Sequence, residues 1–218
     1  MIDSYDKLTI GKYRELMALD NDVDDVTKGI NILSVLSDYT EEELYDMPLD
    51  DFSKLMAKTS FLQRNVEKTD WKKLGKQLVI NGKKYDVIKE ARKMTAGQYI
   101  DYREYTKDSE KFMDMLPFIL TVFLIPSGMK YGNGYDTAEL AQEFNDHLDI
   151  KTALSISDFF LHQSKVSMMT SILSLKWMMK RMMKKEKNQE IKEKIQIAVE
   201  RMDYLESLLK SGDGFTQQ

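Results

Sequence analysis

The feature that most constrains the fold of this chain is a seven-residue motif that occurs twice. Lys7–Tyr13 (KLTIGKY) returns as Lys93–Tyr99 (KMTAGQY), and Lys, Thr, Gly and Tyr keep their places. An acidic residue follows two places after each Tyr, at Glu15 and Asp101. Internal similarity of this kind indicates an architecture built from related units. The sequence therefore predicts a duplicated unit, and each motif marks the start of one copy.

Helix signals follow each copy of the motif. Thr9 is placed to cap a helix, because a Thr side chain accepts a hydrogen bond from a backbone N–H of the first turn. Thr40 and Glu43 form a capping box that begins another helix. In a later apolar helix, Pro117 is expected in the first turn and Pro126 at the end. The predicted helices are Thr9–Leu19, Asp24–Ser37, Thr40–Met47, Leu49–Lys58, Thr95–Tyr105, the helix with the apolar run Phe118–Leu124, and one capped near Asp136.

Between the two copies the pattern changes from helical to strand-like. Arg64–Lys73 is polar, with Trp71 as its aromatic residue, and indicates a linker. Two β-type runs, Gln77–Ile80 and Lys83–Ile88, flank Asn81-Gly82, which is the strongest short signal for a β-hairpin. An isolated hairpin is only marginally stable in water, so this one should pack on the helices or join another sheet. The alternative is a flexible polar arm.

The end of the chain carries long helical patterns. From about Ser157 to Lys187 the sequence predicts one long helix or two abutting helices. The last helix spaces its apolar residues alternately by four and three, as in a heptad seam; they are Ile191, Ile195, Ala198, Met202, Leu205 and Leu209. The seam is short, so it should pack back on the preceding helix or onto a partner. Gly212 and Gly214 should end this helix and leave a loose tail.

The predicted fold is therefore mainly α. Two related helical units are joined by a β-hairpin and followed by a C-terminal helical hairpin or coiled-coil segment. The expected divisions are residues 1–67 for the first unit, 68–92 for the linker and hairpin, 93–163 for the second, enlarged unit, and 164–218 for the methionine-rich and heptad helices with the tail.

Composition excludes several functional classes. The chain has 218 residues, 42% of them hydrophobic and 31% charged, which is typical of a soluble globular protein. A net charge of −4 gives no overall attraction to nucleic acid. There is no cysteine, so a disulfide framework, a thiol nucleophile and a Cys-ligated zinc are excluded. We expect no secretory signal in the first residues, and the apolar run Met115–Pro126 is too short to span a membrane.

One acidic stretch has part of the spacing of a calcium loop. Asp20, Asp22 and Asp24 match the first three ligand positions of an EF-hand. The sixth position is Asp25 where Gly is required, and the twelfth is Asn31 where Glu belongs. A helix-breaking turn with acidic residues at a helix N-terminus accounts for the same residues.

Other catalytic and metal-binding patterns are also incomplete. Gly128, Gly132 and Gly134 precede a predicted helix, but their spacing fits no phosphate-binding loop. His147 and His162 are the only histidines, and their spacing predicts no metal site. The sequence therefore predicts no catalytic, metal-binding or cofactor-binding residues, and a protein that is not an enzyme.

The most distinctive composition lies in a methionine-rich basic segment near the C-terminus. Flexible thioethers adapt to varied apolar surfaces and recur at protein-binding grooves. The alternative is core methionine on one face with lysine side chains covering the other. Nucleic acid is the weaker option, since Trp177 is the only aromatic residue among these positive charges. The candidate partner-binding residues are Trp177, Met178, Met179, Lys180, Arg181, Met182 and Met183, with Tyr131 and Tyr135 of the Gly-rich loop.

A family resemblance covers about Lys7 to Phe160. Four stretches carry it: Lys7–Tyr13 with the acidic break and apolar helix that follow, Thr40–Leu49, Lys93–Tyr102 and Phe118–Gly134. Together they resemble proteins of tailed bacteriophages associated with tail or virion assembly. In helical character and size the chain is similar to tail assembly chaperones.

The resemblance implies a non-enzymatic binding protein whose partners are phage tail or virion proteins, such as the tape-measure or tail-tube protein. It implies a location in the host cytoplasm, no membrane and no cofactor, and it leaves a homo-oligomer open. The rival hypothesis is a structural component, such as a connector, tail or cargo-type protein, that is retained in the virion.

Overall fold

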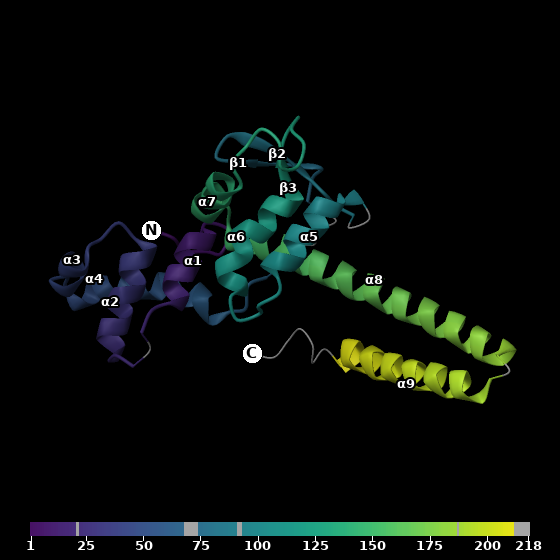
Figure 1. Ribbon diagram of the computed structural model, residues 1–218. Helices are drawn as coiled ribbons and strands as arrows, with labels where there is room; N and C mark the ends of the chain where they lie inside the picture. The colour runs from purple at the N-terminus through teal and green to yellow at the C-terminus, as the bar shows by residue number, and fades with distance from the viewer. Residues whose placement is uncertain (21, 68–73, 91–92, 187, 212–218) are drawn as a thin grey trace. The chain divides into compact units, whose positions relative to one another are not determined.

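The protein is mainly helical with a small antiparallel sheet, as predicted (Figure 1). The computed structural model describes residues 1–20, 22–67, 74–90, 93–186 and 188–211. They form two compact units, Met1–Asp158 and Phe159–Gln218. The elements are α1 (Ile10–Met17), α2 (Asp25–Leu36), α3 (Glu41–Tyr45), α4 (Leu49–Lys58), η1 (Thr59–Gln63), β1 (Gln77–Ile80), β2 (Lys83–Val87), α5 (Ala96–Tyr105), α6 (Phe112–Phe123), β3 (Leu124–Pro126), α7 (Thr137–His147), α8 (Ile150–Lys185) and α9 (Gln189–Ser211).

Some sequence predictions fall outside the described residues. They concern the part of the linker that contains Trp71 and the tail after Ser211. The side chains of His162 and Leu209 are also outside the description, although both residues lie in helices.

Polar caps begin the N-terminal helices, and those at Thr9 and Thr40 were predicted. Thr9 accepts a hydrogen bond from the backbone of Lys12 and starts α1. Asp24 accepts from two backbone N–H groups at the start of α2. Thr40 and Glu43 form the complete capping box of α3. These caps satisfy backbone donors that have no partner within the helix, which is why the polar residues before each helix predicted its start.

Helices α2, α3 and α4 share a small core. Ile30 and Leu33 of α2 are buried with Leu44 of α3; the partly buried residues packed against them are Met47, Phe52, Leu55 and Met56. Gly29 permits the close approach of α4, because a Cβ there would lie 3.0 Å from the Phe52 ring and 3.3 Å from the sulfur of Met56.

The predicted β-hairpin is confirmed and gains a third strand. β1 and β2 pair antiparallel with Ile80 opposite Lys83. Asn81 and Gly82 both have positive φ angles, 49° and 75°, as a two-residue hairpin turn requires. β3 pairs antiparallel with the other side of β2, so the sheet order is β1-β2-β3.

The predicted bounds of the apolar helix were wrong at both ends. α6 begins at Phe112, so Pro117 lies inside it rather than in its first turn. A proline there removes the helical hydrogen bond to the carbonyl of Met113. The helix ends at Phe123, and Leu124–Pro126 becomes β3 instead of completing the helix. Pairing with β2 decides this end, and β2 lies about 40 residues earlier in the chain, beyond the reach of local patterns.

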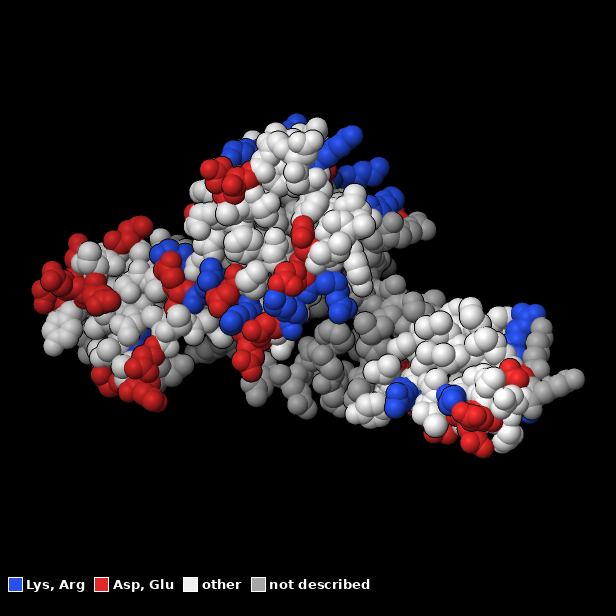
Figure 2. All heavy atoms as spheres, viewed as in Figure 1, with Lys and Arg blue, Asp and Glu red and all other residues white. Residues whose placement is uncertain are grey.

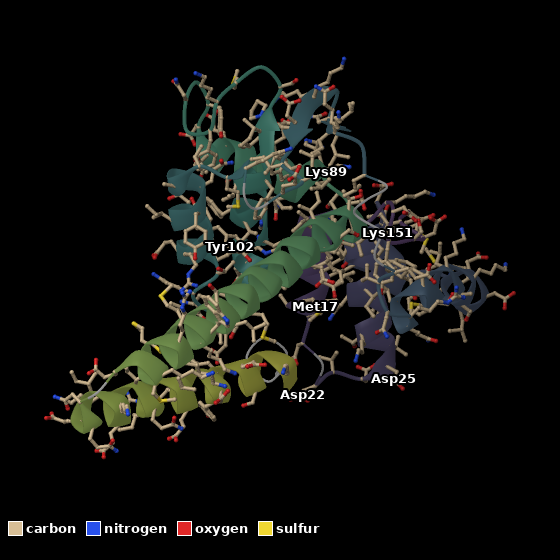
Figure 3. All side chains as sticks on the ribbon, turned by 90° about the vertical axis from the view of Figure 1, so that its right-hand side faces the viewer. Met17, Asp22, Asp25, Lys89, Tyr102 and Lys151 are labelled. Carbon is tan, nitrogen blue, oxygen red and sulfur yellow. The ribbon has the colours of Figure 1, made fainter. Side chains whose placement is uncertain are left out.

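The main core of the first unit surrounds α6. Tyr85 of β2 meets Phe144 of α7 edge-on, with ring centroids 5.1 Å apart. Tyr102 of α5 meets Phe123 of α6 at 5.4 Å (Figure 3). The buried side chain of Gln98 donates a 2.7 Å hydrogen bond to the carbonyl of Val122. The sheet, α5 and α7 therefore enclose α6.

The first motif is built into this same core. Leu8 and Ile10 are fully buried. Their backbones bond to the segment between α7 and α8: the N–H of Ile10 donates to Leu148 at 3.1 Å, and the N–H of Ile150 donates to Leu8 at 2.8 Å. Lys151 adds an ion pair to Asp6 at 2.9 Å (Figure 3). Segments from all three of the first predicted divisions thus belong to one compact unit.

The two motifs share their local structure and differ in their surroundings. Thr9 and Thr95 both cap the helix that follows. A Cβ on Gly11 would lie 2.7 Å from the Asn145 side chain, whereas one on Gly97 would meet only Thr95, at 3.9 Å. Duplication of the unit stays a prediction, while the start signal common to both copies is a structural fact.

The second unit is a pair of antiparallel helices, the C-terminal part of α8 and α9 (Figure 1). α8 begins at Ile150, seven residues before the predicted start, and continues from the first unit into the second. Lys176 of α8 forms ion pairs with Asp203 and Glu206 of α9. Ile172 and Val199 are the buried apolar side chains of the pair among those described.

Candidate protein-binding surfaces

A row of exposed apolar side chains follows each helix of the C-terminal pair. On α8 the row consists of Leu175, Met178 and Met182, and on α9 of Ile191, Ala198 and Leu205; all are exposed except the half-buried Ala198. Spacings of three, four and seven residues keep each row on one face of its helix. These six residues are called the C-terminal apolar face below.

Both rows lie on the same side of the pair. The ion pairs of Lys176 and the buried Val199 mark the sides on which the helices face each other. At about 100° per residue, the α8 row is turned by roughly 100° to 160° from Lys176 and the α9 row by roughly 80° to 120° from Val199, in the same sense. Because the helices run antiparallel, these rotations about the two helix axes bring both rows to the same side of the pair. A shallow groove of about 360 Å³ runs along its α9 edge.

The predicted methionines divide between this face and the packed side. Met178 and Met182 are exposed, and Met178 keeps 49% of its surface accessible. Met179 and Met183 are half-buried and share the helical side of Lys176, which faces α9. The sequence could not separate these pairs, because the choice depends on which side of α8 receives α9.

Positive charge flanks the apolar face on both helices. Arg181 lies beside Met178 on α8, and its guanidinium carbon is 5.4 Å from the centre of the exposed Trp177 ring, a cation–π distance. Lys194 and Arg201 line the groove on α9. Lys180 is also exposed, on another side of α8. The face thus has an apolar centre, with Arg181 at its α8 edge and Arg201 and Lys194 at its α9 edge, where Lys194 is ion-paired with Glu190 at 2.6 Å.

The helix pair is held by a charged cluster beside this face. The hydrogen bond from Lys176, with a second from Lys210, lowers the pKa of Glu206 to about 2. Hydrogen bonds to Asp203 and Glu206 raise the pKa of Lys176. The cluster is therefore charged at neutral pH and links α8 to α9.

The two predicted loop residues have structural contacts of their own. The hydroxyl of Tyr131 donates a 2.6 Å hydrogen bond to Asp101, and the hydroxyl of Tyr135 accepts one from the Gly132 backbone at 3.2 Å. Burial raises the pKa of both phenols, and Asp101 raises that of Tyr131 further. Both residues anchor the loop and belong to the first unit, whereas the other predicted residues belong to the second.

A second candidate surface was not anticipated from the sequence. The segment 20–51 contains eleven acidic residues and one basic residue. Acidic side chains gather over α2–α4 in Figure 2, and Figure 3 labels Asp22 and Asp25 near the start of α2. Among them Tyr45 and Leu49 are 80% and 77% exposed, and Tyr39 is exposed as well. The excess of acidic residues in this segment could have indicated the surface from the sequence, but the net charge of the whole chain, −4, does not show it.

An open groove crosses this second surface. It measures about 580 Å³ and lies between α3 and α4; its lining includes Tyr39 and Leu55, the acidic Glu43, Asp46 and Asp51, and the basic Lys54 and Lys58. The acidic face is defined below as Tyr39, Tyr45 and Leu49 with the seven acidic residues of segment 38–51, which are Asp38, Glu41, Glu42, Glu43, Asp46, Asp50 and Asp51.

Two of the residues that resembled a calcium loop accept hydrogen bonds from nearby backbone N–H groups. Asp20 accepts a 2.8 Å hydrogen bond from the N–H of Asp22, and Asp24 caps α2. Within the described part of the chain, no three His, Asp or Glu side chains are grouped to hold a metal ion. No helix in that part is both long and apolar enough to cross a membrane.

Comparisons with known proteins do not extend this description. No protein-family model, curated protein or solved structure matches the chain.

Proposed function

We propose that this protein is a non-enzymatic assembly protein that binds other proteins through the C-terminal apolar face. The supporting observation is the row of exposed Met178 and Met182 beside Ile191 and Leu205, with basic groups on both edges. A contiguous apolar surface with a polar rim is typical of a protein-interaction site. The matching partner segment is an amphipathic helix with an apolar stripe and acidic flanks.

The biological setting that we propose is tail assembly in a tailed bacteriophage, with the protein acting as a tail assembly chaperone. The motifs at Lys7–Tyr13 and Lys93–Tyr99 support this proposal through their resemblance to phage assembly proteins. The partner is then a tape-measure or tail-tube protein, bound before assembly in the host cytoplasm. Methionine side chains suit that task, since they adapt to more than one partner surface.

The second candidate is a structural component that remains in the virion, an alternative to which the resemblance to virion assembly proteins also points. Mass spectrometry of purified particles separates the two functions. A chaperone is absent from the particle and co-purifies with a tail protein from infected cells. A component is present in the particle in a fixed copy number.

Two matched variants test the binding face. Met178→Glu places a charge on the C-terminal apolar face, whereas Leu173→Glu makes the same change on the opposite side of α8. Both wild-type side chains are 49% exposed, so their substitution disturbs the fold to a similar degree. Tagged full-length variants are used to capture partners from infected cells, and the bound tail protein is quantified by mass spectrometry.

We expect Met178→Glu to reduce capture about tenfold or more, since a charge in a desolvated apolar contact costs more than 1.4 kcal/mol. Leu173→Glu should retain capture, and both variants should keep the wild-type helical circular dichroism. Equal capture by the two variants would contradict the assignment of the binding face. Absence of any tail protein from the wild-type capture would contradict the proposed function.

A further inference from the structure

The acidic face combines exposed apolar groups with unbalanced negative charge. Tyr45 and Leu49 are its most exposed apolar groups, and seven acidic residues lie within segment 38–51, which has no Lys or Arg; Lys54 and Lys58 of α4 line the groove. Among the residues that the structure describes, Asp51 is the only one of the seven in an ion pair, with Lys54 at 2.9 Å. The groove beside it, about 580 Å³, is large enough for side chains of a docking helix.

The C-terminal apolar face has the complementary character. Its centre is formed by Met178, Met182 and Leu205, and its edges carry Arg181 and Arg201. One surface of the chain is therefore apolar with an acidic rim, and another surface is apolar with a basic rim. Opposite rims attract, while two acidic or two basic faces brought together repel.

We propose that the C-terminal apolar face of one molecule docks on the acidic face of a second copy. The contact buries Met178 and Met182 against Tyr45 and Leu49 and pairs the basic rim with carboxylates. Because the two faces differ, two copies can exchange both contacts in a closed dimer, or the contacts continue head to tail from copy to copy. The inference goes beyond the proposed function and does not depend on it, since both faces belong to this chain.

The same contact has a consequence for partner binding. The C-terminal apolar face is covered by a second copy when no other protein is bound, and an assembly partner has to displace that copy. Self-association thereby protects exposed methionine and leucine side chains from non-specific aggregation.

Two charge-reversed variants test the contact. Glu42→Lys with Asp46→Lys alters the acidic face and leaves the C-terminal face intact. Arg181→Glu with Arg201→Glu alters the C-terminal face and leaves the acidic face intact. The exposed positions of these side chains should preserve the fold, which far-UV circular dichroism checks.

Sedimentation velocity and light scattering of the full-length protein measure the outcome. The wild type should form dimers or larger species as its concentration rises from about 1 to 100 μM. Raising the salt from about 0.05 to 0.5 M should shift it toward monomer, since exposed charges are then screened. Leu173→Glu should associate like the wild type.

The decisive result comes from mixing the variants. Each variant alone lacks one of the two faces and should be monomeric. An equimolar mixture offers two matched pairs, the two intact faces and the two charge-reversed faces, so it should associate where each variant alone does not. A monomeric wild type, or a mixture that stays monomeric, would overturn the inference. Capture of the tail protein is a separate measurement, so failure here leaves the proposed function standing.

Discussion

The repeated motif offers a sharp test of the packing, because its two glycines occupy the same helical position in different surroundings. Gly11 and Gly97 are each the second residue of a Thr-capped helix. A Cβ on Gly11 would lie 2.7 Å from the side-chain amide nitrogen of Asn145 and 3.1 Å from its backbone carbonyl oxygen. A Cβ on Gly97 would meet nothing closer than the Thr95 hydroxyl at 3.9 Å. The same substitution, Gly to Ala, should therefore have opposite effects.

The magnitudes follow from the contacts. In both helices alanine lowers the entropy of the unfolded chain, which stabilises the fold by about 0.4 to 1 kcal/mol. At Gly11 the new methyl group also meets a backbone carbonyl that cannot rotate away, and overpacking of this kind costs about 1 to 3 kcal/mol. The Asn145 side chain is held as well, since its oxygen accepts a 3.1 Å hydrogen bond from Arg14. We expect Gly11→Ala to destabilise by about 1 to 2 kcal/mol and Gly97→Ala to stabilise by about 0.4 to 1 kcal/mol.

Urea unfolding followed by circular dichroism measures the difference, and both residues belong to the first unit, so the same transition reports on both. In thermal unfolding the two variants should move apart by about 3 to 12 °C, at about 2 to 4 °C per kcal/mol for a unit of this size. If Gly11→Ala stabilised as Gly97→Ala does, α1 would not pack against Asn145, and the placement of the first motif in the core would be wrong.

Two further predictions concern the C-terminal helix pair. The double substitution Met179→Glu with Met183→Glu places charges on the packed side. This variant should lose part of the helical signal, and its free energy of unfolding by urea should fall by about 1 to 3 kcal/mol. A stable variant with normal circular dichroism would show that these methionines are not packed against α9. The pKa of Glu206 is lowered to about 2 from its ordinary 4.5, so its contribution to stability is complete above about pH 4.5 and is lost as the pH falls toward 2. Glu206→Gln should weaken this acid dependence in urea unfolding between these pH values, and an unchanged pH profile would contradict the link to Lys176.

Local signals predicted much of the fold because they act over a few residues. Thr9 and Thr40 indicate helix starts, because their side chains accept hydrogen bonds from the first turn of the helix that follows. Asn81-Gly82 announces the hairpin because these residues tolerate the positive φ angles of its turn. The candidate binding segment also followed from composition, since methionine and basic residues are concentrated there.

Long-range contacts decided what local patterns could not. Leu124–Pro126 continues an apolar helical run, yet it forms a strand because β2 provides a free edge to pair with. In α9 the predicted heptad row and the row through Val199 both have helical spacing, so periodicity alone cannot choose between them. Packing against α8 decides between them: Val199 is buried, while Ile191 and Leu205 remain exposed.

The sequence by itself determined that the chain is mainly helical, where most helices begin, and which segment carries the methionines. Only the tertiary structure decided which methionines are available to a partner, and that the acidic segment forms a face with exposed Tyr45 and Leu49. The physical reason is that hydrogen-bonded caps and turns are completed within a few residues, whereas burial depends on which other elements cover a side chain.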